Sequence, residues 1–379
     1  MFTNFANVWT PVGVASTLKQ KPLSVELAGE RLVLFRGPAG RAAALIDRCP
    51  HRGVALSMGT VNGAGCLECP FHGWAFRGDG GCDHIPLSNL SEQNRRHYAA
   101  TSLPLREIGG LLWVFTGQDP TGTEPELPLA LLDPKWHTWV YEATWNTHWT
   151  RAMENMLDSV HVPFVHSRNF GGEMRARIRQ DSVLRTEIEP RPWGAVISNE
   201  LDGEVSRKIL LWRSPNGMEL HLPVPLGERR MHIYCVPLGG NRTRMILVNA
   251  RNYRRGKLMS KLLDRDSSGV LDEDRSIVES AQPPEVPPPG EERSVANDGP
   301  TLYFRRYYYR ELRGSTATLV PATRLNARVA TATAVECEPS DIAPGDPLTP
   351  ADASRSTSAS TAGATPLQRE LGTGSDASA

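Results

Sequence analysis

The sequence predicts an α+β protein, and three observations carry that prediction. Short runs of strand-forming residues bounded by glycine dominate residues 1–118. Residues 183–250 look like successive antiparallel strands, whereas residues 145–161 and 257–280 repeat apolar side chains at helical spacing. For residues 136–312 we therefore expect a curved antiparallel sheet with helices packed against it.

The first domain is expected to span residues 1–118. Residues 31–36 and residues 110–116 are rich in β-forming side chains and are predicted to be strands. Many Gly, Pro and Asp residues lie between them, as is typical of loops supported by a small β-scaffold. Residues 119–135 are rich in Pro, Gly and Thr, which indicates a linker.

The second domain, residues 136–312, is expected to begin with a helix over residues 145–161. Four side chains in it recur at helical spacing: Trp149, Met153, Met156 and Val160. Pro163 should stop or kink this helix, because proline lacks an amide hydrogen and clashes with the preceding turn. Further along, residues 282–290 form a proline-rich connector. The aromatic side chains of residues 303–309 are expected to pack rather than to bind a ligand.

Residues 313–379 differ in composition from the rest of the chain. Ala, Thr, Ser and Pro dominate this segment, and aromatic residues are almost absent from it. Such a segment cannot bury enough apolar surface to offset the entropy that folding costs. We therefore expect a disordered tail.

Charge and hydropathy argue against some classes of partner. The 379 residues include 42 Lys plus Arg and 42 Asp plus Glu, and this balance indicates neither nucleic acid nor an anionic membrane as a partner. We find no run of about 18 apolar residues that would predict a membrane span. The N-terminal residues lack the basic and apolar regions of a secretory signal, so a cytoplasmic location is expected.

Two Cys/His pairs, separated by 17 residues, stand in the first domain. They are Cys49-x-His51 and Cys69-x2-His72. Two such loops can converge so that the cysteines hold one iron of a [2Fe–2S] cluster and the histidines hold the other. Histidine in place of cysteine raises the reduction potential of such a cluster. The pattern therefore favours an electron-transfer centre.

A structural zinc site is the alternative, because two Cys and two His also suit tetrahedral Zn²⁺. Common zinc patterns keep the cysteines together and the histidines together, whereas each pair here joins one cysteine to one histidine. The cluster interpretation is therefore preferred. Cys66 and Cys82 fall outside the pattern and are expected to be buried small hydrophobic residues or bystander thiols.

A second group of candidate ligands lies in and after the first predicted helix. Asp158 and His161 are three residues apart, which places them along one helical face, and His166 follows five residues later. On a continuous helix the two histidines would diverge, but a break at Pro163 lets His166 turn back towards His161. Two imidazoles held in this way are two of the three ligands of a facial Fe(II) triad.

Three successive acidic residues, Asp272, Glu273 and Asp274, offer the missing carboxylate. At i±3 and i±4 on a helix, Asp274 has four apolar neighbours: Val270, Leu271, Ile277 and Val278. Asp272 has polar or small residues at the same offsets and should face solvent, while Glu273 is intermediate. A buried carboxylate is costly unless it is paired or bound to a metal, so Asp274 is the predicted third ligand.

Together these motifs resemble those of the Rieske non-haem iron oxygenases, in the α subunit that serves as the terminal oxygenase. The resemblance covers about residues 5–312 and is greatest to α-only monooxygenases and O-demethylases. It implies an all-β Rieske domain followed by a catalytic domain of the helix-grip type. It also implies a head-to-tail homotrimer in which Asp158 bridges His72 and His161 across the subunit interface and orients both imidazoles.

The resemblance implies that the chain uses O2 to hydroxylate or demethylate a ring-containing small molecule. Electrons would come from NAD(P)H through a separate reductase or ferredoxin, because the sequence has no nucleotide- or flavin-binding motif. Two other classes remain open, namely a Rieske electron carrier without a working mononuclear iron and a zinc-stabilised binding module. The intact His161, His166 and Asp274 argue against the first, and the mixed Cys/His pairs argue against the second.

Overall fold

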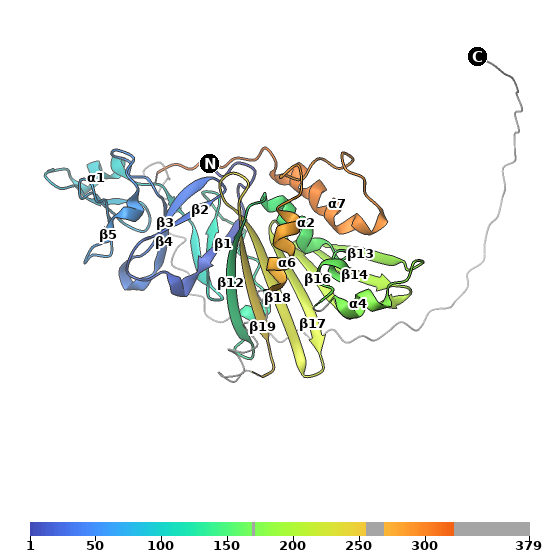
Figure 1. Ribbon diagram of the computed structural model, residues 1–379. Helices are drawn as coiled ribbons and strands as arrows, with labels where there is room; N and C mark the ends of the chain where they lie inside the picture. Colours follow the sequence, from blue (N-terminus) through green and yellow to red (C-terminus); the bar gives the residue numbers. More distant parts are fainter. Residues whose placement is uncertain (169–170, 255–268, 322–379) are drawn as a thin grey trace, which may run out of the picture. The chain divides into compact units, whose positions relative to one another are not determined.

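The computed structural model describes residues 1–168, 171–254 and 269–321, which form four antiparallel sheets (Figure 1). Three small sheets belong to the N-terminal part, with strand orders β1-β11-β10, β2-β3-β4-β9 and β5-β6-β7-β8. The elements of this part are β1 (Trp9–Val14), β2 (Leu23–Leu27), β3 (Glu30–Arg36), β4 (Ala42–Ile46), β5 (Thr60–Val61), β6 (Leu67–Glu68), β7 (Ala75–Phe76), β8 (Cys82–His84), α1 (Glu92–Arg95), β9 (Ser102–Leu103), β10 (Leu105–Ile108) and β11 (Leu111–Phe115). Apart from the single turn of α1 and four 3-10 turns of three residues each, the expected all-β character is confirmed.

The fourth sheet has eight strands, in the order β12-β19-β18-β17-β16-β14-β13 with β15 paired to β14. Its strands are β12 (His137–Trp145), β13 (Leu184–Arg191), β14 (Gly194–Leu201), β15 (Glu204–Val205), β16 (Ile209–Arg213), β17 (Gly217–Val224), β18 (Gly227–Pro237) and β19 (Thr243–Arg251). The described helices are α2 (Trp149–Leu157), α3 (Val162–Val165), α4 (Gly172–Arg177), α6 (Gly269–Val278) and α7 (Gly299–Tyr307).

Helices cover one face of the large sheet, which confirms the α+β class. Figure 1 shows α2 and α6 side by side over the sheet, and α2 contacts β17, β18, α6 and α7. The second predicted helix, residues 257–280, corresponds to α6 in its described part, while residues 255–268 lie outside the described residues. None of the helices that the structure describes is long and apolar enough to span a membrane.

The first predicted helix is shorter than expected, because residues 145–161 are not one element. Trp145 ends strand β12, and α2 ends at Leu157. The next residue, Asp158, is extended (φ −84°, ψ 128°) and its carboxylate accepts hydrogen bonds from the amides of Val160 (2.7 Å) and His161 (3.3 Å). A short side chain that bonds to nearby backbone amides competes with the helix, so α2 stops there.

The sequence suggested that Pro163 would end the first helix, but it does not. It occupies the first turn of the separate one-turn helix α3. Proline is tolerated in that turn because the amide there has no partner within the helix. The predicted break does occur, but an acidic side chain produces it five residues before the proline.

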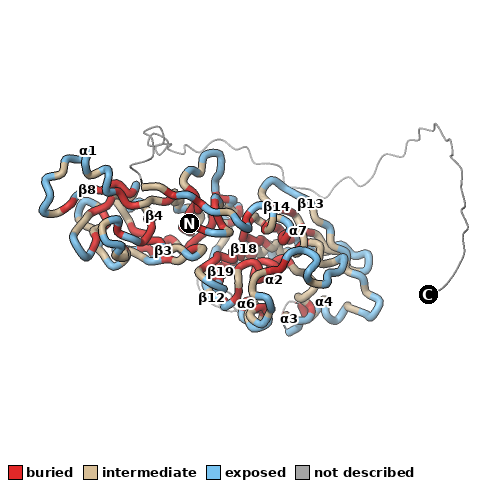
Figure 2. The backbone as a smooth tube through the Cα atoms, turned by 90° about the horizontal axis from the view of Figure 1, so that it is seen from above, coloured by how far each residue is buried: buried red, intermediate tan, exposed pale blue. Residues whose placement is uncertain are grey.

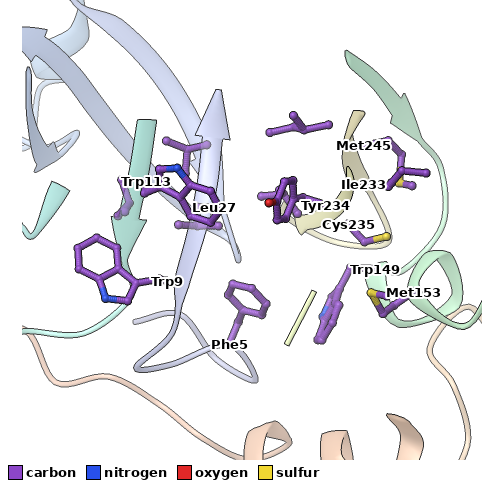
Figure 3. Close-up of a cluster of buried hydrophobic side chains, with 14 of the residues drawn as sticks. Phe5, Trp9, Leu27, Trp113, Trp149, Met153, Ile233, Tyr234, Cys235 and Met245 are labelled. Carbon is purple, nitrogen blue, oxygen red and sulfur yellow. The ribbon is translucent and has the colours of Figure 1, made fainter. Parts of the chain in front are cut away.

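The main core runs without interruption from the N-terminal sheets to the large sheet (Figure 3). Trp113 of β11 meets Tyr234 of β18 edge to face, with ring centroids 5.3 Å apart, and Phe5 meets Trp149 of α2 at the same distance. Each large side chain buried in this way contributes about 1.5–3 kcal/mol. Figure 2 shows buried residues along β18, β19 and α2, whereas the loop that carries α1 is exposed.

The aromatic segment of residues 303–309 belongs to this core, as predicted. Phe304 and Tyr308 are fully buried, and both rings contact Trp149 edge to face. Packing is therefore the role of these two rings.

Residues 313–321, the first part of the predicted tail, are described and make contacts, whereas residues 322–379 lie outside the described residues. Between residues 313 and 320 the chain pairs with the N-terminus: the Met1 amine donates to the Ala317 carbonyl (3.0 Å) and the Ala317 amide donates to the Met1 carbonyl (2.9 Å). The side-chain oxygen of Gln118 accepts from the amide of Val320 at 2.8 Å. These residues lack the apolar content to fold alone, but the N-terminal part supplies the partners that their composition does not reveal.

Candidate metal centres

The two Cys/His pairs occupy two turns of the same design, residues 49–54 and 69–74. In both turns the cysteine amide donates to the carbonyl five residues later, at 2.8 Å. The amide of the glycine at the fifth position donates back to the cysteine carbonyl, at 2.9 Å for Gly53 and 3.0 Å for Gly73. Both glycines have a positive φ, +75° and +67°, which residues with a Cβ rarely adopt. The recurring cysteine and glycine thus build the same loop twice.

The four side chains of these turns are the candidate ligands of a [2Fe–2S] cluster. Cys49 and Cys69 are each 2% exposed. Burial, together with the adjacent thiol of Cys69, raises the pKa of the Cys49 thiol to about 11. The rings of His51 and His72 are 4.6 Å apart. The Nδ1 atom of His51 is buried without a hydrogen-bond partner among the described residues, as a nitrogen reserved for a metal would be.

The two ends of this centre differ in their surroundings. Both cysteines belong to a small core of their own, beneath the turns and separate from the main one. The histidine end lies nearer the surface, where the ring of His51 stacks on Trp74 at 4.4 Å and His72 is exposed next to Phe71. Cys66 and Cys82 are buried and free, as expected for residues outside the pattern.

The second group of predicted ligands comes together around the short helix α3. His161 precedes α3 and His166 follows it, so one helical turn brings the two rings to a centroid distance of 5.3 Å. Asp274 of α6 reaches the same point from 108 residues further along the chain and is 3% exposed. The donor atoms of these three residues all lie within 4.8 Å of one another, a group that could hold a metal ion.

The orientation of these side chains fits a metal between them. Oδ1 of Asp274 lies 3.6 Å from Nε2 of His161 and 3.1 Å from Nε2 of His166. This oxygen is buried, yet it makes no hydrogen bond of acceptable geometry with the described residues. A buried carboxylate oxygen facing two imidazole nitrogens is costly unless a cation completes the group. Two imidazoles and one carboxylate are the ligand set that non-haem Fe(II) takes.

A carboxylate also lies beside the outer nitrogen of each histidine, although only that of His166 is hydrogen-bonded to its carboxylate. Oε2 of Glu273 lies 2.7 Å from Nδ1 of His166, and Oδ2 of Asp158 lies 3.4 Å from Nδ1 of His161. A carboxylate on the outer nitrogen fixes the ring orientation and leaves Nε2 free to bind the metal. Asp158 thus lies next to His161, as predicted. It reaches this position from the end of α2, however, and not from the face of a helix that continues to His161.

The electrostatics of the site favour positive charge. Burial opposes protonation of His166, yet the carboxylates of Asp274 and Glu273 outweigh it and raise the pKa of this imidazole. Burial likewise opposes ionisation of Asp158, but the His161 ring and two backbone amides hold the pKa of this carboxyl below its usual value. Negative charge around two imidazoles suits a divalent cation.

Sequence reasoning chose Asp274 correctly as the buried carboxylate, although one of its arguments was wrong. Ile277, taken as a buried neighbour, is 53% exposed, so the buried face of α6 consists of Leu271, Asp274 and Val278. Glu273 was regarded as intermediate and no role was predicted for it. The one feature of the sequence that could have indicated a role is its position beside Asp274. On a helix, adjacent residues point about 100° apart, so Glu273 can reach one histidine from the side while Asp274 faces both.

A cavity of about 730 Å³ opens onto His161, His166 and Asp274. Its walls come from α2, α3, α4 and α6 and from strands β13 to β18. Apolar side chains such as Met218, Leu220 and Met231 line much of it. The three candidate ligands therefore stand in the wall of a chamber large enough for an organic molecule.

Two family models match the chain, one on each side of the predicted linker. The Rieske [2Fe-2S] domain matches residues 8–94, and the vanillate O-demethylase oxygenase C-terminal domain matches residues 145–312. Among solved structures, NdmA of Pseudomonas putida CBB5 aligns with a TM-score of 0.66 and 23% identity over 80% of this chain and 89% of that chain. The alignment shows that the two proteins share a fold.

Curated relatives are similar over part of their length. Chloroplastic pheophorbide a oxygenase of Oryza sativa subsp. japonica is 30% identical over 264 residues, which are 65% of this chain and 49% of the relative. The 3-chlorobenzoate-3,4-dioxygenase oxygenase subunit of Comamonas testosteroni is 31% identical over 188 residues, 48% of this chain and 42% of the relative. The chain thus spans about half the length of the curated relatives that it matches.

A Rieske-type domain followed by a sheet-and-helix domain with two histidines and a carboxylate defines the class of two-centre iron oxygenases. The family models place both domains in this chain in that order. The chain belongs to the Rieske non-haem iron oxygenase family and is similar to its α subunits. Members of this family carry a Rieske [2Fe–2S] cluster and a mononuclear iron.

Proposed function

We propose that this chain is a terminal oxygenase that oxidises a ring-containing small molecule with O2 and externally supplied electrons. The observation that carries the proposal is the convergence of His161, His166 and Asp274 within 4.8 Å of one another in the wall of a large cavity. An electron carrier needs neither this ligand group nor the chamber. The alternative of a Rieske protein without a second iron is therefore less well supported.

The residues that would hold each group follow from the geometry. Cys49, Cys69, His51 and His72 would hold the [2Fe–2S] cluster, and the Nε2 atoms of His161 and His166 would hold iron together with Asp274. When bound, the iron supplies the activation of O2 that protein side chains cannot provide. The protein's own task is to position the substrate and exclude bulk water from the reacting centre. The apolar walls of the cavity suit that task.

Electron delivery requires partners outside this chain. We infer a separate reductase or ferredoxin that draws on NAD(P)H, and a homotrimer in which His72 of one copy faces Asp158 of the next. Two features support this arrangement: His72 is exposed, and the Asp158 side chain is 30% exposed although it is already hydrogen-bonded to the backbone. A carboxylate so placed can accept from a second imidazole and orient both rings.

The relatives indicate what kinds of substrate the fold accommodates. The name of one relative specifies pheophorbide a and that of the other specifies 3-chlorobenzoate. We infer a ring-containing substrate for this chain and either hydroxylation or demethylation as the reaction.

The proposal is tested by O2 consumption of the reconstituted holoprotein with a chemical reductant and a panel of ring compounds. The His161→Ala variant should lose substrate-dependent O2 consumption while the visible spectrum of the cluster stays unchanged. His97→Ala is the matched control, because His97 is exposed and belongs to neither group of candidate ligands, and it should behave like the unmodified protein. Retained substrate-dependent turnover in His161→Ala would contradict the proposed site.

A further inference from the structure

The cavity beside the three candidate ligands indicates the class of substrate, an inference that rests on the proposed function. We propose that the substrate is a multi-ring, largely apolar molecule that carries an acidic group at its outer end. Its body would lie on the sheet, and its acidic group would meet Arg207 at the mouth of the cavity. Three features support this assignment: the size of the apolar floor, the side chains of the walls and the charges at the mouth.

The floor of the cavity is wider than one ring. Leu210, Leu220 and Met231 stand directly opposite one another on β16, β17 and β18. This row therefore extends over two strand spacings, about 10 Å. Met218 and Ile233 form a second row on the same face, two residues further along the strands, which adds about 7 Å in the other direction. A single ring would leave most of this floor uncovered.

The size of the cavity supports the same conclusion. Small-molecule sites enclose about 300–1,000 Å³, and the 730 Å³ found here lies in the upper part of that range. A ligand that leaves apolar wall exposed to water forgoes about 25 cal/mol for each Å² left uncovered. A molecule of several fused rings covers the floor and both rows, so it gains far more from this chamber than benzoate could.

The walls can adapt to a bulky body. Four methionines line the cavity: Met156, Met174, Met218 and Met231. Methionine is unbranched and has three rotatable bonds, so it fills irregular gaps around a ligand at little cost. Met218 and Met231 belong to the floor on β17 and β18, whereas Met156 and Met174 come from helices α2 and α4. A fused ring system could therefore be enclosed without a wall shaped for one planar ring.

Among the lining residues that the structure describes, the mouth of the cavity carries more positive than negative charge. Arg177, Arg207 and Lys208 line it, together with the carboxylates of Glu173 and Glu204. The guanidinium of Arg177 is engaged by Glu204 in an ion pair. Arg207 forms no ion pair with any residue that the structure describes and is exposed. An arginine in this position can bind a carboxylate through two parallel hydrogen bonds.

The burial of the lining residues gives the orientation. The inner end is marked by His166 and Asp274, which are 2% and 3% exposed, and the outer end by the exposed Arg207. The turn that carries Arg207 is anchored to β14 by the Ser206 amide, which donates to the Asn199 carbonyl at 2.8 Å. An acid bound by Arg207 would thus leave the apolar body directed towards the metal ligands.

The test is a binding measurement on the holoprotein, which needs no turnover. Isothermal titration calorimetry would compare three probes: abietic acid (three rings and a carboxylate), the corresponding neutral alcohol abietinol, and benzoate. We expect abietic acid to bind at least about tenfold more tightly than either of the others, which corresponds to about 1.4 kcal/mol. Equal affinity for benzoate and abietic acid would overturn the proposal.

Two variants separate the contribution of charge from that of size. Arg207→Gln should weaken abietic acid about tenfold and leave abietinol unchanged, because only the acid uses the guanidinium. Arg310→Gln is the control: its side chain is 82% exposed and does not line the cavity, so neither affinity should change. Leu220→Phe should weaken both three-ring probes. If the Arg207→Gln variant bound abietic acid as tightly as the unmodified protein does, the proposed contact between Arg207 and an acidic group of the substrate would be contradicted.

The proposed function and the substrate class can fail separately. Tight binding of abietic acid without any ligand-stimulated O2 consumption would support the substrate class and contradict the oxygenase function. Turnover of single-ring compounds combined with weak binding of abietic acid would contradict the substrate class and support the function.

Discussion

The two candidate metal centres are built from the sequence in opposite ways. The Rieske turns are local: residues 49–54 and 69–74 repeat one hydrogen-bond pattern, and each turn contains both of its ligands. The mononuclear group is assembled across the chain, from the two ends of α3 and from Asp274 in α6. A motif read along the chain therefore describes the first centre almost completely, whereas the second depends on where helices end and how they pack.

The side chains around the histidines differ as well. His51 and His72 have aromatic neighbours, Trp74 and Phe71. His161 and His166 instead have carboxylates at their outer nitrogens, from Asp158 and Glu273. Carboxylates strengthen the binding of a dication by its imidazole ligands. The comparison thus supports the proposal of an electron relay near the surface and a separate site that binds one divalent ion.

The largest effect should follow from loss of a cluster ligand. Cys69→Ser replaces a thiolate that belongs to both the cluster and the small core around it, so the visible absorption of the cluster should disappear. Cys66→Ala is the matched control, because Cys66 is equally buried but lies outside the pattern, and the colour should remain. An unchanged spectrum in Cys69→Ser would show that the ligands are wrongly assigned.

Removal of the carboxylate ligand should empty the second centre and leave the first intact. Asp274→Ala should lose the mononuclear iron and all substrate-dependent O2 consumption, while acid-labile sulfide and the cluster spectrum stay unchanged. The matched control is Asp272→Ala on the exposed side of the same helix, which should retain its iron. Full iron content in Asp274→Ala would show that Asp274 is not a ligand of the mononuclear iron.

Glu273 tests whether the outer carboxylates matter. Glu273→Ala should weaken Fe(II) binding about 10–100-fold, because Nδ1 of His166 loses its partner at 2.7 Å. Glu273→Gln keeps an acceptor oxygen and should recover part of the affinity. The measurement is Fe(II) titration of the metal-depleted protein. Unchanged affinity together with lower thermal stability would assign Glu273 a purely structural role.

The smallest effect should come from the turn geometry of the first centre. Gly53→Ala places a Cβ at a φ of +75°, which costs about 1–2 kcal/mol, and no close atom adds a clash. The free energy of unfolding should fall by that amount in chemical denaturation. Gly63→Ala, in the same region with open space around it and no positive φ, should change it little. Equal values for the two variants would contradict the need for glycine in the turn.

The sequence allowed the fold class and both ligand groups to be predicted, because each rests on spacing or on periodic burial. It misplaced the end of the first helix, since the competition between the Asp158 side chain and the helix depends on the local backbone conformation. It did not reveal the role of Glu273, which appears only when α6 is packed beside α3. The ordered residues up to Val320 were also missed, because their partners lie at Met1 and Gln118.

The most direct test of two distinct centres is the metal and acid-labile sulfide content of anaerobically purified protein. The account predicts two sulfides and three irons per chain, two irons in the cluster and one held by His161, His166 and Asp274. Zinc without sulfide would contradict the first centre. Two irons with two sulfides, unchanged after anaerobic addition of Fe(II), would contradict the second.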